Sequence, residues 1–259
     1  VIELDITDFG VNGEGIGRVS DYAFFVKNAL PGDKVRAVIT KMKKGFGFAK
    51  TIEIVTPSPF RREPPCHEAD RCGGCQIMQL DYRKQLELKQ KMVRNNLERI
   101  GGQKDFILRP IIGMEGECPV HFRNKVQLPL GKASDGRVIT GFYAGRTHFI
   151  VETEECCIST DIAMKAAESV KSFIEEAGIS VYDEKTGKGL VRHILIRQGF
   201  YTNQIMVCLV INGESLPCAD ELVSRLREFD GMSSISLNVN RERTNVILGS
   251  RLINLYGPG

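Results

Sequence analysis

The sequence lacks the features that would place a protein in a membrane or outside the cell. None of its apolar runs approaches the 18 or so residues that a membrane-spanning helix needs. Residues 1–5 carry neither the basic nor the apolar segment of a secretion signal. Eight cysteines among 259 residues are too sparse for a disulfide scaffold. We therefore expect a cytoplasmic protein that has no contact with a membrane.

A large excess of charge of one sign is also missing. Lys and Arg total 35 and Asp and Glu total 32, so the net charge of +3 says little about a polyanionic partner. Only the positions of the basic residues can support nucleic-acid binding. With 42% hydrophobic residues the chain can bury one large core or two smaller ones.

Prolines mark a boundary inside the chain. Residues 1–56 alternate apolar and polar side chains in short runs separated by glycine-rich turns, which is typical of a small β-barrel. Pro57, Pro59 and the pair at 64–65 then interrupt any continuing strand. The sequence therefore predicts a barrel over residues 1–56 and a second domain over residues 57–259.

The second domain combines helices with strand-like runs. Asp81 is a candidate N-cap for a helix that ends at Gly101. Its apolar face would consist of Leu86, Val93, Leu97 and Ile100. Two further helices are predicted over residues 160–177 and 217–229, and strands over residues 120–130, 138–143, 147–152, 190–197, 204–211 and 234–240. Short hairpin-type links favour antiparallel pairing, so we predict an α+β fold with a mainly antiparallel sheet.

The most specific signal is a group of three cysteines on a loop before the first helix. Cys66, Cys72 and Cys75 are separated by five and two residues, and two intervening glycines let the backbone wrap closely around a bulky inorganic group. Thiolates are soft ligands that suit zinc or an iron-sulfur cluster, and the spacing does not decide between the two. Cys156 or Cys157 could supply a fourth ligand, and His67 is the zinc-type alternative.

Other cysteines and glycines are assigned no chemistry. Cys208 in an apolar strand and Cys218 at a helix start are typical of small buried side chains. Nothing in the sequence places a base beside Cys118, so we do not interpret it as a nucleophile. The glycine run at residues 13–17 lacks the strand, loop and helix context of a cofactor loop.

Basic and aromatic residues alternate in one turn of the predicted barrel. They are Lys41, Lys43, Lys44, Phe46, Phe48 and Lys50. Lysines can neutralise phosphates while exposed rings stack on unpaired bases. The alternative is a solvated basic turn with both rings in the barrel core. Further basic residues lie on predicted strands of the second domain, where an outward face would continue the basic track: Arg123, Lys125, Arg146, His148, Arg192 and Arg197.

Together these motifs resemble the RumA-type 23S rRNA (uracil-5)-methyltransferases. The resemblance rests on Cys-x5-Cys-Gly-Gly-Cys-Gln from Cys66 and on residues 121–125, 141–150, 191–197 and 238–249, and it covers essentially the whole chain. It implies that residues 1–56 form a TRAM domain, an all-β, OB-like barrel that binds RNA. It also implies that the α+β central domain carries a [4Fe-4S] cluster with Cys66, Cys72, Cys75 and Cys156 as ligands, which favours iron-sulfur over zinc.

In that family a later domain performs the chemistry. A cysteine attacks C6 of the uracil, C5 accepts the methyl group of S-adenosylmethionine, and an acidic residue helps to remove the C5 proton. The resemblance implies that the helix at residues 81–101 docks against that domain. We expect this chain to be a trimmed RNA-recognition portion that is inactive alone, with S-adenosylmethionine as a cofactor of the full-length enzyme only.

The resemblance also names the partner. It implies 23S rRNA as the bound RNA, and we expect the protein to be a monomer. Two alternatives stay open. The chain could be a stand-alone iron-sulfur module that binds RNA or senses redox state, or a relative of the tRNA uracil-5-methyltransferases.

Overall fold

The computed structural model describes residues 1–258, which form two compact units. Unit 1 contains residues Val1–Pro65 and Cys75–Pro119, and unit 2 contains Cys66–Gly74 and the chain from Val120 onwards. These units do not coincide with the predicted ranges 1–56 and 57–259, because the linker and the first helix group with the barrel. Within the described part of the chain, no helix has the length and apolar character that a bilayer-spanning segment needs.

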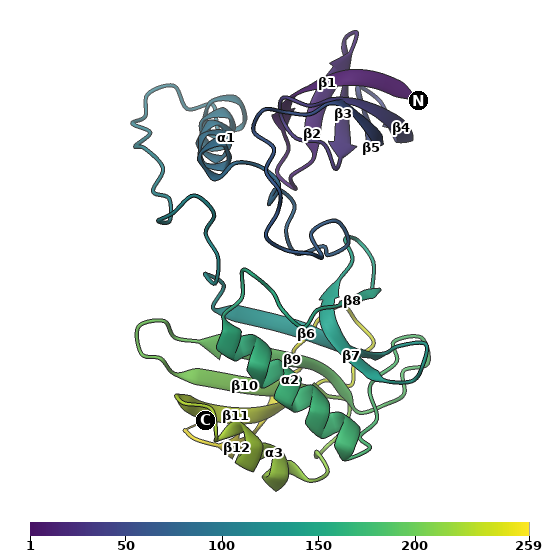
Figure 1. Cartoon of the computed structure of the whole chain (residues 1–259), viewed down its shortest axis with the longest axis vertical. Coiled ribbons are helices and arrows are strands. Elements are labelled where there is room, and N and C mark those ends of the chain that lie inside the picture. The colour runs from purple at the N-terminus through teal and green to yellow at the C-terminus, as the bar shows by residue number, and fades with distance from the viewer. Residues whose placement is uncertain (259) are drawn as a thin grey trace. The chain divides into compact units, whose positions relative to one another are not determined.

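Unit 1 contains a closed five-stranded barrel in the order β1-β2-β3-β5-β4 (Figure 1). Its strands are β1 (Ile2–Phe9), β2 (Gly15–Val19), β3 (Tyr22–Lys27), β4 (Lys34–Lys43) and β5 (Phe46–Thr56). Neighbouring strands are antiparallel except for β3 and β5, which are parallel. Alternate side chains fill the interior, among them Leu4, Ile6, Phe24, Val26 and Val35. The predicted all-β barrel is confirmed.

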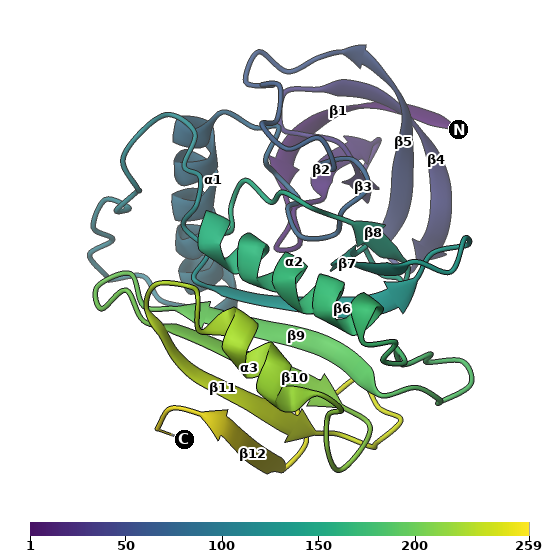
Figure 2. The ribbon, with the colours of Figure 1, turned by 60° about the horizontal axis from the view of Figure 1, so that its bottom comes forward.

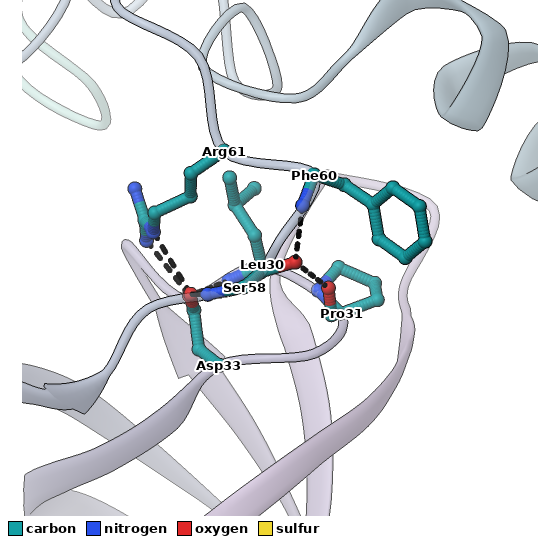
Figure 3. Close-up of polar contacts among 6 residues, drawn as sticks. All are labelled: Leu30, Pro31, Asp33, Ser58, Phe60 and Arg61. Atoms are coloured by element: carbon teal, nitrogen blue, oxygen red, sulfur yellow. Dashed lines mark hydrogen bonds and ion pairs between the residues drawn. The ribbon is translucent and has the colours of Figure 1, made fainter.

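An ion pair between Asp33 of the barrel and Arg61 of the linker fixes the chain where it leaves the barrel (Figure 3). The carboxylate of Asp33 is fully buried and accepts hydrogen bonds from Nε and Nη2 of Arg61 at 2.8 and 2.7 Å. It also accepts from the backbone N–H groups of Leu30 and Ser58, at 2.6 and 2.8 Å. The hydroxyl of Ser58 donates to the carbonyl of Pro31 at 2.7 Å. Four of these hydrogen bonds join the linker residues Ser58 and Arg61 to the barrel.

Helix α1 (Tyr82–Asn95) begins as predicted. The carboxylate of Asp81 accepts a hydrogen bond from the backbone N–H of Lys84 at 3.2 Å, which satisfies one of the free donors of the first turn. The helix continues as a short π-helical segment, η1 (Asn96–Ile100), and stops at Gly101.

The predicted apolar face of α1 is not buried. Within this helix, all of which the structure describes, only Leu88 is buried, and it packs against Phe9 and Leu30 of the barrel. Val93 is 48% exposed, and Ile100 of η1 is 83% exposed. Periodicity identified the helix correctly, but it could not identify which face has a neighbour to pack against.

Unit 2 contains a seven-stranded sheet in the order β12-β11-β10-β9-β6-β7-β8 (Figure 2). The strands are β6 (Lys125–Lys132), β7 (Val138–Tyr143), β8 (Ile150–Glu152), β9 (Val191–Gln198), β10 (Ile205–Ile211), β11 (Met232–Val239) and β12 (Arg251–Tyr256). Only β10 and β11 pair in parallel, so the predicted mainly antiparallel sheet is confirmed. Strand β12 was not predicted.

Helices α2 (Asp161–Glu176) and α3 (Ala219–Leu226) cover one face of this sheet (Figure 2). Buried side chains of both helices belong to one cluster with Ile194 and Ile196 of β9. Because side chains alternate along a strand, His193 and Leu195 point to the opposite face. Both side chains are buried there as well, so β9 is covered on its two faces.

Candidate nucleic-acid interface and cysteine loop

Three phenylalanine rings pack against one another on the outside of the barrel. Phe25 of β3 is the register partner of Phe48 of β5, and Phe46 lies two residues before Phe48 on the same side. Phe24 and Val26 point into the core, so Phe25 points outward. The three ring centroids are 5.6 to 5.7 Å apart, and each ring is half-buried. Phe25, Phe46 and Phe48 therefore form an aromatic platform on the surface, and neither predicted ring lies in the barrel core.

Lysines surround the aromatic platform. Lys27 and Lys50 are register partners two residues beyond Phe25 and Phe48, so they lie on the same side of the strands as the rings. On the other side, β4 places a lysine opposite each ring of β5, and Nζ of Lys43 lies 5.5 Å from the centroid of Phe46. The exposed lysines of this surface are Lys27, Lys41, Lys43, Lys44 and Lys50. Rings in the centre and ammonium groups around them are the combination that single-strand binders use.

Sequence reasoning missed Phe25 and Lys27. They lie about twenty residues before the basic turn, and only the parallel pairing of β3 with β5 brings them beside it. A signal was present, because two adjacent phenylalanines in a strand cannot both face the core.

The basic residues of the second domain are partly brought together. Lys125 of β6 lies directly opposite Arg197 of β9, and both are exposed. Two like charges in this position repel each other, so an anion between them would be favourable. Arg146 and His148 are exposed in the turn between β7 and β8, and Arg123 is half-buried before β6.

Arg192 requires a correction, because it does not lie on an exposed face. It is 5% exposed, and its Nη1 donates to the carbonyls of Asn240 and Glu242 at 2.8 and 2.9 Å. Its guanidinium also lies 4.4 Å from the ring centroid of Tyr182. A register irregularity between β9 and β10 at this point breaks the simple alternation of side chains. Arg192 therefore fixes the loop after β11 and is not available to RNA.

Backbone hydrogen bonds hold the cysteine loop against the strands of unit 2. Cys72 forms a β-bridge with Ala144, and the N–H of Gly73 donates to the carbonyl of Tyr143 at 2.9 Å. A Cβ at Gly73 would lie 2.7 Å from that same oxygen, so only glycine allows this approach. The loop is positioned by its backbone, whatever its thiols bind.

The thiol of Cys72 interacts electrostatically with two predicted partners. Burial raises the pKa of Cys72, the backbone N–H of Gly74 opposes that rise, and negative charge on Cys156 or Cys66 would raise it further. Arg123 acts in the opposite direction. Two of the other predicted ligands, Cys66 and the distant Cys156, therefore lie within electrostatic reach of Cys72 in unit 2.

The predicted [4Fe-4S] cluster is not confirmed. Among residues 1–258, no group of three or more His, Cys, Asp or Glu side chains is gathered as a metal site. Soft thiol donors and a glycine that admits close backbone approach fit such a cluster chemically. Cys75 and Cys157 are half-buried; Cys75 is grouped with unit 1, and the carbonyl of Cys157 accepts a hydrogen bond from the N–H of His121 at 2.8 Å.

Comparison with known proteins supports the barrel and finds relatives that are named RNA methyltransferases. Residues 1–52 match the TRAM domain. The chain is 42% identical over 255 residues to a Clostridium tetani protein and 43% identical over 256 residues to one from Caldanaerobacter subterraneus, each named an uncharacterized RNA methyltransferase. These matches cover 98% of this chain and 55% and 56% of the two relatives. The chain thus spans about half the length of the curated relatives it matches.

A solved structure is similar as well. It is the Pyrococcus abyssi tRNA (uracil-54, C5)-methyltransferase in complex with S-adenosyl-L-homocysteine, which is 27% identical with a TM-score of 0.67. The match covers 99% of this chain and 55% of that one. The chain therefore has an N-terminal TRAM domain and is homologous, over nearly its whole length, to RNA methyltransferases.

Proposed function

We propose that this chain recognises RNA for an S-adenosylmethionine-dependent RNA (uracil-5)-methyltransferase. The observation that carries the proposal is the aromatic platform of Phe25, Phe46 and Phe48 with its surrounding lysines. Unpaired RNA offers base faces and phosphates, and this surface has a partner for each. The relatives' names support methyl transfer to RNA. The similar Pyrococcus abyssi enzyme supports uracil C5 as the target and, through its bound S-adenosyl-L-homocysteine, S-adenosylmethionine as the donor.

The RNA that we propose is 23S rRNA. The combination of the cysteine loop, the barrel and the strand motifs resembles the 23S rRNA enzymes. A tRNA is the second candidate, because the similar solved structure is named for tRNA.

Basic residues of unit 2 would extend the contact with phosphates. Lys125 and Arg197 lie opposite each other, which supports an anion between them. Arg146 and His148 lie in one exposed turn, and Arg123 approaches the cysteine loop closely enough to affect Cys72. We include these residues in the proposed RNA contact and leave Arg192 out.

We also propose that Cys66, Cys72, Cys75 and Cys156 bind a [4Fe-4S] cluster. The effects of Cys66 and Cys156 on the thiol of Cys72 support three of these ligands. Cys75 follows Cys72 after two glycines, which allow the short loop to turn both thiols towards one centre. When bound, the cluster would join the cysteine loop to the segment before α2.

A salt titration of RNA affinity tests the proposed function. Alanine at Lys41, Lys43, Lys44 and Lys50 together should weaken the binding of single-stranded RNA and flatten the dependence of log K on log salt, by roughly 0.7 for each phosphate that is no longer neutralised. The matched control is Lys165→Ala, which removes an exposed lysine from α2. Equal salt slopes for the wild type and the fourfold variant would exclude these lysines from the interface.

A further inference from the structure

Unit 2 contains a cluster of aromatic and charged side chains around Glu184. One carboxylate oxygen, Oε1, accepts a hydrogen bond from the hydroxyl of Tyr143 at 3.3 Å. The other, Oε2, contacts Nδ1 of His148. A carboxylate can only accept, so Nδ1 of His148 carries the proton and donates it to this hydrogen bond. One carboxylate therefore holds two rings that come from β7 and from the turn after it.

The two rings contact each other in a tilted arrangement, and His148 is the more exposed of the two. The centroids of Tyr143 and His148 lie 5.2 Å apart with 33° between the ring planes, within the range of favourable aromatic contacts. Tyr143 is partly buried, whereas the side chain of His148 is 56% exposed and that of Glu184 is 43% exposed. His148 is therefore the outer ring of the stack.

The turn that carries His148 is fixed by its own hydrogen bonds. The hydroxyl of Thr147 donates to the carbonyl of Ala144 at 3.0 Å and accepts from the N–H of Phe149 at 3.1 Å. The N–H of Ala144 donates to the carbonyl of Phe149 at 2.8 Å. Arg146 takes the left-handed conformation, with φ of 65°, which closes the turn. The imidazole is thus positioned before any ligand arrives.

Two buried basic residues lie close to this cluster. Burial and the charge of Arg192 lower the pKa of His193 to about 4, and Glu184 acts in the opposite direction, so His193 is neutral at pH 7. Burial and Glu184 raise the pKa of Tyr143, so its hydroxyl keeps its proton and stays a donor. Nε of Arg192 and Nδ1 of His193 are buried without a hydrogen-bond partner in the described chain. The protonated hydroxyl of Tyr143 can therefore donate to Glu184, which accepts hydrogen bonds from both rings.

We propose that one unpaired nucleobase of the bound RNA stacks on the outer face of His148, with Glu184 as the residue that positions the ring. An exposed aromatic ring that packs against a second ring can accept a planar partner of similar size, which in RNA is a base. Arg146, exposed in the same turn, would face the phosphates of that strand. The proposal rests on the proposed function and adds a base site in unit 2 to the aromatic platform of unit 1.

Two substitutions distinguish base stacking on the ring of His148 from attraction of the RNA by a positive charge at this position. The probe is a short single-stranded RNA with one 2-aminopurine, whose fluorescence falls when the base stacks. His148→Tyr keeps a ring and should retain the quenching with about the wild-type affinity. His148→Lys keeps a positive group without a ring, and should lose the quenching and bind about 5- to 150-fold more weakly. The reverse order of the two variants would overturn the proposal.

The positioning role of Glu184 is tested by a double-mutant cycle. Glu184→Ala should weaken binding about 2- to 12-fold, because the ring must then be ordered when RNA binds. In a His148→Ala background the same substitution should have no further effect. Glu228→Ala, which removes an exposed carboxylate between α3 and β11, is the matched control, and thermal melts check folding.

The outcomes of the cycle separate the two ideas. A full effect of Glu184→Ala in the His148→Ala background would overturn the positioning role while leaving the proposed function intact. Failure of the wild type to bind any RNA would overturn the proposed function and this inference with it.

Discussion

Asp33 illustrates how much one buried carboxylate can organise. It receives two hydrogen bonds from Arg61 and two from backbone N–H groups, so all of its strong acceptor positions are used. A carboxylate is stable in the interior only when it is paired and hydrogen-bonded in this way. The position of the linker after the barrel therefore depends on Asp33, which lies in the turn before β4.

We expect Asp33→Ala to lower the free energy of unfolding by about 3 kcal/mol, because it leaves Arg61 and two backbone donors without their acceptor. The matched control is Glu53→Ala, which breaks an exposed ion pair of 2.8 Å with Arg36 and should cost less than about 1 kcal/mol. Urea denaturation measures both. Equal losses would mean that burial adds nothing to the pair of Asp33.

The cysteines can also be examined one at a time. If the proposed cluster is correct, anaerobically purified protein contains iron, and Cys156→Ser lowers the iron content whereas Cys157→Ser does not. The two positions are adjacent, so each serves as the control for the other. Stoichiometric zinc without iron, or an effect of Cys157 alone, would contradict the proposed ligand set.

At the scale of elements, the two adjacent phenylalanines of strand β3 point to opposite sides of the strand and have different roles. Phe24 is buried in the barrel core, whereas Phe25 is half-buried in the aromatic platform. The strand period of two explains the division, and the parallel partner β5 explains why Phe25 meets Phe48. The same strand therefore contributes one side chain to the barrel core and one to the candidate binding surface.

We expect Phe25→Ala to weaken the binding of single-stranded RNA by about 1 to 3 kcal/mol while the unfolding temperature changes little. Phe24→Ala should instead lower stability by about 3 to 5 kcal/mol, because it opens a cavity in the core. A thermal melt beside each binding titration distinguishes the two. If Phe25→Ala destabilised the barrel as strongly as Phe24→Ala, the platform would be part of the core.

Several elements could be predicted from the sequence because their signals are local. The barrel strands follow from alternation, and the start of α1 follows from the side chain of Asp81. The positions that failed depend on distant neighbours. Val93 and Ile100 are exposed because a helical pattern does not specify its packing partner, and Arg192 is buried because of an irregular register between two strands. Strand β12 was missed because its exposed side chains show no clear alternation.

The candidate site shows the same division. The cysteine loop and the lysine turn were visible because their residues are close in the sequence. Phe25, Tyr143 and Glu184 were not singled out, since each acquires its role from a residue on another strand or loop. Sequence spacing can therefore suggest a site, but tertiary contacts complete it.

At the scale of the whole molecule, the preference for one RNA over another distinguishes the two candidate partners. If 23S rRNA is the partner, a transcript of the rRNA segment should bind about tenfold more tightly than a tRNA transcript at the same salt concentration. Competition between the two transcripts for the purified chain measures this directly. A preference for tRNA would favour the second candidate, and equal affinities would indicate that residues 1–259 contribute only general RNA binding.

The buried pair of Asp33 and Arg61 also bears on how such proteins recombine. A crossover in the proline-rich stretch after residue 56 would combine a barrel from one parent with a linker from another. Unless both parents carried the same pair, the hybrid would have either a lone buried carboxylate or an arginine without its acceptor. Inheritance of the barrel as a working module therefore requires a breakpoint beyond Arg61, several residues after the point where the composition of the chain changes.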